Sequence, residues 1–144
     1  MIKRFLVMVA AVLILAVTSD SADFTINWNE PDSIKQYVCE VYDKEIVPSD
    51  FIVEVIDRES SFIIVPSSCK NQVGLMQITP ACAEAMGYDF QDVAKYPWLN
   101  IECGVKYLIL CYEKAKGNLH EAYEYYNRGL WWYEVEAKKD STGK

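Results

Sequence analysis

The stretch DFIVEVIDRESS, residues 50–61, decides the fold class. Ile52, Val55 and Ile56 recur at the three- and four-residue spacing that is typical of an α-helix with one buried face. Pro48 stands just before the stretch, where it marks a boundary between two helices. The sequence therefore predicts a helix over these residues that packs against a core.

Further helical patterns lie on both sides of this stretch. Residues 62–73 contain β-branched side chains followed by Pro and Ser, and we expect a loop or short hairpin there. The aromatic residues 131–133 are expected to add a last helical turn. The pattern as a whole predicts a mostly α, single domain of five to seven helices. The remaining helices are predicted from Asp32 onward, from Thr79 to Gly87, from near Asn100 to Gly117, and from Asn118 to Arg128.

The N-terminal segment has the order of a secretory signal peptide: a short basic start, an apolar run and then small residues. The apolar run, residues 5–17, is shorter than the ~20 residues of a membrane-spanning helix. We therefore expect residues 1–22 to be a cleaved signal peptide and residues 23–144 to form one extracytoplasmic domain. The alternative is a retained N-terminal anchor that tethers this domain to the membrane.

Composition narrows the possible partners and cofactors. The formal net charge of −7 argues against nucleic acid and against anionic membrane surfaces as partners. His120 is the only histidine and no CxxC motif occurs, so we expect no metal site and no cofactor. Export would permit disulfides, and buried thiols are the alternative. Because the cysteine count is odd, at least one cysteine stays free or pairs with another molecule. The five cysteines are Cys39, Cys69, Cys82, Cys103 and Cys111.

Glu59 carries a charge on the apolar face of the predicted helix at 50–61. At about 100° per residue, Glu59 falls within about 20° of the line through Ile52. A carboxyl group in an apolar cleft has a raised pKa and can hold a proton for general acid catalysis. The alternative is that the helix ends at Glu59 and the side chain reaches water.

Four short blocks follow one another along the chain: ESSF at 59–62, GLMQITP at 74–80, NI at 100–101 with Gly104 and YL at 107–108, and YNRG at 126–129. This set and its order resemble the catalytic domain of the soluble lytic transglycosylase family, which shares the goose-type lysozyme fold. The resemblance covers about residues 50–129. It implies a lysozyme-like domain that acts on the glycan strands of peptidoglycan.

The resemblance also implies roles for individual residues. Glu59 would be the single catalytic acid/base, and Tyr126 would direct its hydroxyl toward Glu59. The residues that would line the saccharide groove or sit beside it are Ser60, Met76, Gln77, Tyr126 and Asn127. Structural roles are the alternative to these assignments. Met76 and Tyr126 could belong to the core, and Asn127 could form hydrogen bonds at the helix end before Gly129.

The sequence departs from the family pattern at three places. Ile63 and Ile64 stand where Asn-Pro is common, Val73 replaces a small residue before GLMQ, and Tyr125 replaces an alanine before the YN pair. These departures bear on the shape of the groove and on the substrate more than on the chemistry.

Two reactions are open to an enzyme of this kind. Glycoside hydrolases usually need two carboxylates, one of which activates water. A lytic transglycosylase, as the family implies, needs one, because the 6-hydroxyl of the muramic acid closes an anhydro ring. Residues 60–83 contain no Asp or Glu, which favours the lyase. For a hydrolase, Glu84, Asp89 and Glu124 are the first candidates for the second carboxylate.

A function of another class also fits the sequence. The domain could be a non-catalytic wall-binding module, or a structural part of an envelope-spanning machine or of a phage particle. The presence of Glu59 together with Gln77 and Tyr126 argues against a purely binding role.

Overall fold

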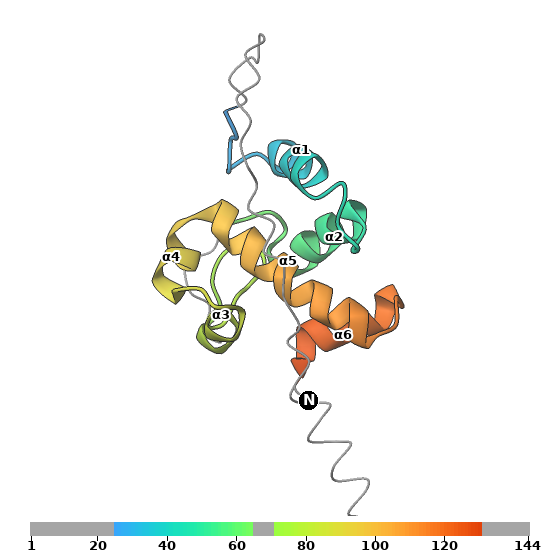
Figure 1. The fold of residues 1–144 in the computed structure, drawn as a ribbon. Helices are drawn as coiled ribbons and strands as arrows, with labels where there is room; N and C mark the ends of the chain where they lie inside the picture. The colour runs from blue at the N-terminus through green and yellow to red at the C-terminus, as the bar shows by residue number, and fades with distance from the viewer. Residues whose placement is uncertain (1–24, 65–70, 131–144) are drawn as a thin grey trace, which may run out of the picture.

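The computed structural model describes residues 25–64 and 71–130, and these residues form six α-helices (Figure 1). They contain no strand; Val73 and Ile78 form one isolated antiparallel bridge. The prediction of a mostly α, lysozyme-like domain is confirmed. The predicted signal peptide and the aromatic residues 131–133 lie outside the described residues. The helices are α1 Pro31–Val41, α2 Ser49–Ser60, α3 Pro80–Met86, α4 Phe90–Lys95, α5 Pro97–Lys114 and α6 Leu119–Arg128.

Helix α5 is the centre of the fold (Figure 1). It contacts α3, α4 and α6, while α1 packs on α2. Its buried residues lie on more than one face, as expected for a helix surrounded by others. The core therefore forms around α5, which itself carries the sequence block that begins at Asn100.

The cap residues explain where several helices begin. The hydroxyl of Thr79 accepts a hydrogen bond from the amide of Cys82 at 3.1 Å, and Pro80 follows as the first helical residue. The side chain of Asn118 accepts a hydrogen bond from the amide of Glu121 at 3.0 Å. Both caps satisfy amides that have no partner within the helix, which is why the predicted boundaries hold.

The structure differs from the prediction between residues 90 and 99. Helix α4 was not predicted, because its six residues are too few to show a helical period. Its signal is the cap residue Asp89, whose carboxylate accepts hydrogen bonds from the amides of Gln91 and Asp92. Helix α5 begins at Pro97 instead of near Asn100, with proline at the first helical position.

Gly104 gives α5 the space that the side chain of Met76 fills. A Cβ atom at Gly104 would lie 2.4 Å from the Sδ atom of Met76 and 2.7 Å from its Cβ atom. Met76 itself is completely buried. Residues 74–77 form a loop, the GLMQ loop, which contains Met76. This loop can approach α5 closely only because Gly104 has no side chain.

Gly104→Ala should destabilise the protein even though alanine favours helix. Overpacking a dense core costs about 1–3 kcal/mol, which exceeds the ~1 kcal/mol gain in helix propensity. We expect a lower midpoint in urea unfolding, while Glu113→Ala on the exposed side of α5 leaves the midpoint nearly unchanged. A Gly104→Ala variant as stable as the wild type would contradict this packing.

Candidate active site

Glu59 lies in the last turn of α2 and is partly buried. The helix ends directly after it, because Ser61 and Phe62 have φ angles of 51° and 60° and turn the chain away. The hydroxyl of Ser60 donates to the carbonyl of Ile56 at 3.1 Å. Glu59 is therefore held on a helix end that packs against the core through Val55 and Ile56.

The GLMQ loop is a tight turn closed by its own backbone. The amide of Val73 donates to the carbonyl of Ile78 at 3.0 Å, and the amide of Ile78 donates back at 2.9 Å. Gly74 and Gln77 have φ angles of 76° and 50°, so the turn uses left-handed backbone at both positions. The amide of the Gln77 side chain donates to the carbonyl of Gly74 at 2.9 Å.

Asn100 on α5 fixes this loop from inside the protein. Its side chain is 1% exposed, accepts from the amide of Met76 at 2.9 Å and donates to the carbonyl of Val73 at 2.9 Å. It also lies 3.3 Å from the carbonyl of Val93, as a weaker donor. A Cβ atom on Gly74 would lie 2.2 Å from the Asn100 side chain, so only glycine fits there. The loop is thereby positioned by the central helix.

Helix α6 brings two tyrosines to the site. The hydroxyl of Tyr126 donates to the carbonyl of Met76 at 2.8 Å, and the hydroxyl of Tyr123 donates to Oε1 of Glu59 at 3.1 Å. The prediction that the Tyr126 hydroxyl points at Glu59 is therefore wrong. Tyr126 is buried and its hydroxyl is used by the loop backbone, while Tyr123 lies one turn earlier on the same helix and reaches the carboxylate.

A pocket of about 240 Å³ opens beside Glu59, and we call it the acid pocket. A second pocket of about 310 Å³ adjoins it and has most of the lining of the acid pocket in common. The two together form a groove along α6 and the GLMQ loop. The acid pocket is lined by Glu59, Gln72, Gln77, Tyr126 and Asn127. The adjoining pocket is lined by Gln72, Gln77, Ile78, Thr79, Cys82, Tyr107, Tyr126, Asn127, Arg128 and Gly129.

The structure thus brings Glu59, Gln77, Tyr126 and Asn127 together, but it places two other expected residues differently. Met76 does not line the groove, because its side chain fills the space over Gly104 in the core. Ser60 is not among the described residues of the groove either, since its hydroxyl turns back to the carbonyl of Ile56.

Sequence reasoning missed Gln72 and Tyr123. Gln72 lines both pockets, and its position two residues before Gly74 was the available signal. Tyr123 lies on the predicted apolar face of its helix, where an aromatic residue is expected simply as part of the core.

Glu59 is the one carboxylate among the described residues that line the groove. The three candidates for a second carboxylate lie elsewhere in the structure. Glu84 is exposed on α3, Asp89 caps α4, and Glu124 forms an ion pair with Arg128 at 3.1 Å. The groove therefore offers one acid within the described residues.

Tyr126 and Cys82, which also line the groove, remain neutral. Burial raises the pKa of Tyr126 well above its ordinary value, and the negative charge of Glu59 adds to this. A hydrogen bond with Cys103, together with burial, raises the pKa of Cys82, so Cys82 remains a thiol. Nucleophilic chemistry by these groups is disfavoured. No cluster of His, Cys, Asp or Glu within residues 25–64 and 71–130 is placed to hold a metal ion.

The sequence matches one known family of domains. A family model described as "Transglycosylase SLT domain" matches residues 36–143, which is most of the chain. The chain belongs to this family of lytic transglycosylase domains, which act on peptidoglycan. No solved structure gave a significant match. In the part of the chain that the structure describes, no helix is both long enough and apolar enough to cross a membrane.

Proposed function

We propose that the protein is a peptidoglycan lytic transglycosylase with Glu59 as its single general acid/base. It cleaves the bond from N-acetylmuramic acid to N-acetylglucosamine and leaves an anhydromuramic end. The observation that carries this proposal is the position of Glu59 as the one carboxylate among the described residues that line the groove.

The reaction needs one proton carrier and no water. Protonated Glu59 donates its proton to the glycosidic oxygen, the bond from this oxygen to the anomeric carbon breaks, and an oxocarbenium-like centre forms. The 6-hydroxyl of the same muramic residue then bonds to the anomeric carbon. Its proton passes to the Glu59 carboxylate, which restores the acid. Attack within one molecule has a very high effective concentration, so no second base is required to orient the nucleophile.

The groove supplies groups suited to holding a sugar beside this acid. The side chains of Gln72, Gln77 and Asn127 bring amide donors and acceptors to the acid pocket. Tyr126 contributes a buried aromatic ring, which limits water at one wall. These features favour a bound glycan over free water as the nucleophile.

The location of the protein follows from the predicted leader and the substrate. A cleaved signal peptide at residues 1–22 would release the domain into the periplasm or to the cell wall, where peptidoglycan lies. A retained leader would tether the domain to the membrane instead. In either case the domain could act alone or within an envelope-spanning or phage assembly.

Cleavage is distinguished from mere wall binding by incubating the protein with purified cell-wall sacculi. We expect the wild type to release soluble muropeptides and the Glu59→Gln variant to sediment with the sacculi without releasing them. Sedimentation of the wild type without any release would support a wall-binding module and contradict an enzyme.

A further inference from the structure

Tyr123 contacts the carboxylate of Glu59 but is not among the residues that line the groove. We infer that Tyr123 is a positioning residue that holds Glu59 in its reactive orientation and favours its ionised form. This inference rests on the proposed function of Glu59. It adds a residue outside the four sequence blocks to the machinery of the site.

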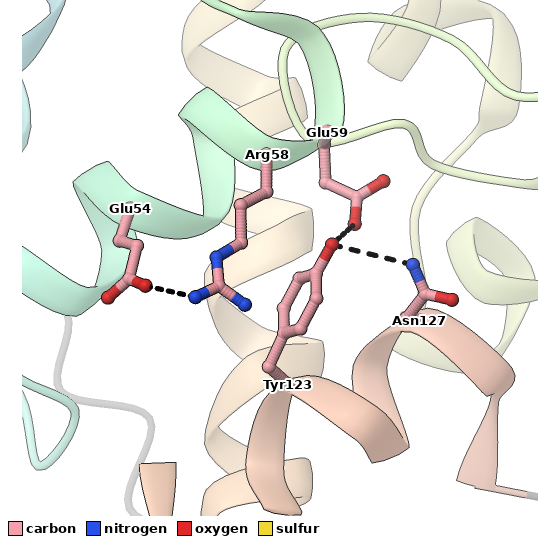
Figure 2. A network of polar contacts seen from close by, with 5 residues as sticks. All are labelled: Glu54, Arg58, Glu59, Tyr123 and Asn127. Atoms are coloured by element: carbon pink, nitrogen blue, oxygen red, sulfur yellow. Dashed lines mark hydrogen bonds and ion pairs between the residues drawn. The ribbon is translucent and has the colours of Figure 1, made fainter. Parts of the chain in front are cut away.

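The contacts of Tyr123 form a chain of polar groups from α2 to α6 (Figure 2). Its hydroxyl donates to Oε1 of Glu59 at 3.1 Å, and the side-chain amide of Asn127 lies 3.4 Å from the same hydroxyl as a donor. The guanidinium of Arg58 lies over the Tyr123 ring, 4.7 Å from its centroid, and Arg58 is also bonded to Glu54. The tyrosine is therefore held at both its ring and its hydroxyl.

Tyr123 reaches the carboxylate from outside the lining of the groove. It does not line the acid pocket, but borders a separate pocket of about 160 Å³ together with Phe51, Arg58 and His120. One oxygen of Glu59 meets Tyr123 while the other points away from it (Figure 2). A substrate in the groove would thus meet Glu59 without meeting Tyr123, so Tyr123 works through Glu59.

The hydrogen bond from Tyr123 should shift the pKa of Glu59 in one direction. A hydroxyl that donates to a carboxylate stabilises the charged form and lowers the pKa of the carboxyl group. Tyr123 stays a donor over the range where a carboxyl group titrates, because burial and the charge of Glu59 raise the pKa of Tyr123. The contact would therefore keep Glu59 oriented while it is the base, and would make it a stronger acid at the first step.

Tyr123→Phe isolates the hydroxyl, because it keeps the ring under Arg58. Tyr126 of α6, whose pKa responds to the charge of Glu59, and Arg58 of α2, which lies over the Tyr123 ring, are unchanged in this variant. The GLMQ loop contributes the uncharged amides of Gln72 and Gln77. A change in the titration of Glu59 can therefore be assigned to the lost hydrogen bond.

The decisive experiment is a carbon NMR titration of the Glu59 carboxyl group in the full mature chain. In Tyr123→Phe we expect the pKa of Glu59 to rise by about one pH unit, since one donor to the charged form is lost. The matched control Tyr112→Phe, on the far end of α5, should leave it unchanged. An unchanged titration in Tyr123→Phe would overturn the inference.

Kinetics give an independent reading. We expect kcat on cell-wall substrate to fall about 10-fold with little change in KM. The alkaline limb of the pH profile, where Glu59 loses its proton, should move to higher pH. A rise in KM alone, with kcat and the pH profile unchanged, would assign Tyr123 to substrate binding and contradict a positioning role.

Two further measurements separate the possible failures. In the unmodified protein, the Cζ signal of Tyr123 should titrate together with Glu59, and this response should vanish in Glu59→Gln. A Cζ signal that ignores Glu59 would overturn the contact even if Tyr123→Phe does not fold. If the wild type cleaves no peptidoglycan, the proposed function is wrong. The titrations of the Glu59 carboxyl group and of the Tyr123 Cζ signal still decide whether Tyr123 changes the pKa of Glu59.

Discussion

Glu59→Gln is expected to reduce the release of muropeptides from purified cell walls by a factor of ~10²–10⁴ or more. The amide has the shape of the carboxyl group but can neither donate nor regain the proton that the reaction moves. It can still accept the hydrogen bond from Tyr123, which lies 3.1 Å from Oε1 in the native protein. The thermal midpoint should therefore stay close to that of the wild type.

The matched control is Asp57→Asn, which makes the same chemical change two residues earlier on α2. Asp57 is exposed and lies outside the described lining of the groove, so this variant should keep full activity. Turnover near the wild-type level in Glu59→Gln would remove Glu59 from the mechanism. Equal losses in both variants would point to damage to α2 instead of to lost acid catalysis.

Asn100→Ala is expected to lower the free energy of unfolding by about 3 kcal/mol, because it leaves buried backbone groups without partners. The amide of Met76 and the carbonyl of Val73 each lose a 2.9 Å hydrogen bond, and the carbonyl of Val93 loses a longer one. Truncating a completely enclosed side chain also leaves a cavity. The thermal midpoint should fall by about 10 °C for a domain of this size.

Activity of Asn100→Ala should fall as well, even below its melting temperature. Asn100 holds the loop that carries Gln77, so a looser loop widens the acid pocket. The control Asn29→Ala changes an exposed asparagine and should shift stability by less than about 0.5 kcal/mol. A loss of stability below about 1 kcal/mol in Asn100→Ala would show that the loop is held by other contacts.

The elements that could be predicted from the sequence are those set by local interactions. The apolar spacing in α2, the Thr79 cap of α3 and the Asn118 cap of α6 depend on residues within one or two turns. The short α4 was missed because its evidence is a single cap residue, Asp89. Periodicity needs a longer segment than six residues to be visible.

The parts of the site that could not be predicted depend on contacts between distant segments. Asn100 belongs to one of the four sequence blocks, but its sequence position does not predict its partners. Its hydrogen bonds reach back 24 residues to Met76 and 27 residues to Val73. Tyr123 and Tyr126 share one face of α6, so the sequence does not decide which hydroxyl meets Glu59. The docking of α6 against α2 and the loop makes that choice.

The central claim is that the sugar's own hydroxyl, and not water, attacks the anomeric carbon. The most direct measurement is mass spectrometry of muropeptides released by the wild-type protein in water enriched in heavy oxygen. We predict anhydromuramic ends that carry none of the label, because no water enters the bond that forms. Reducing muramic ends that carry heavy oxygen would contradict this account and would show a hydrolase with a second carboxylate.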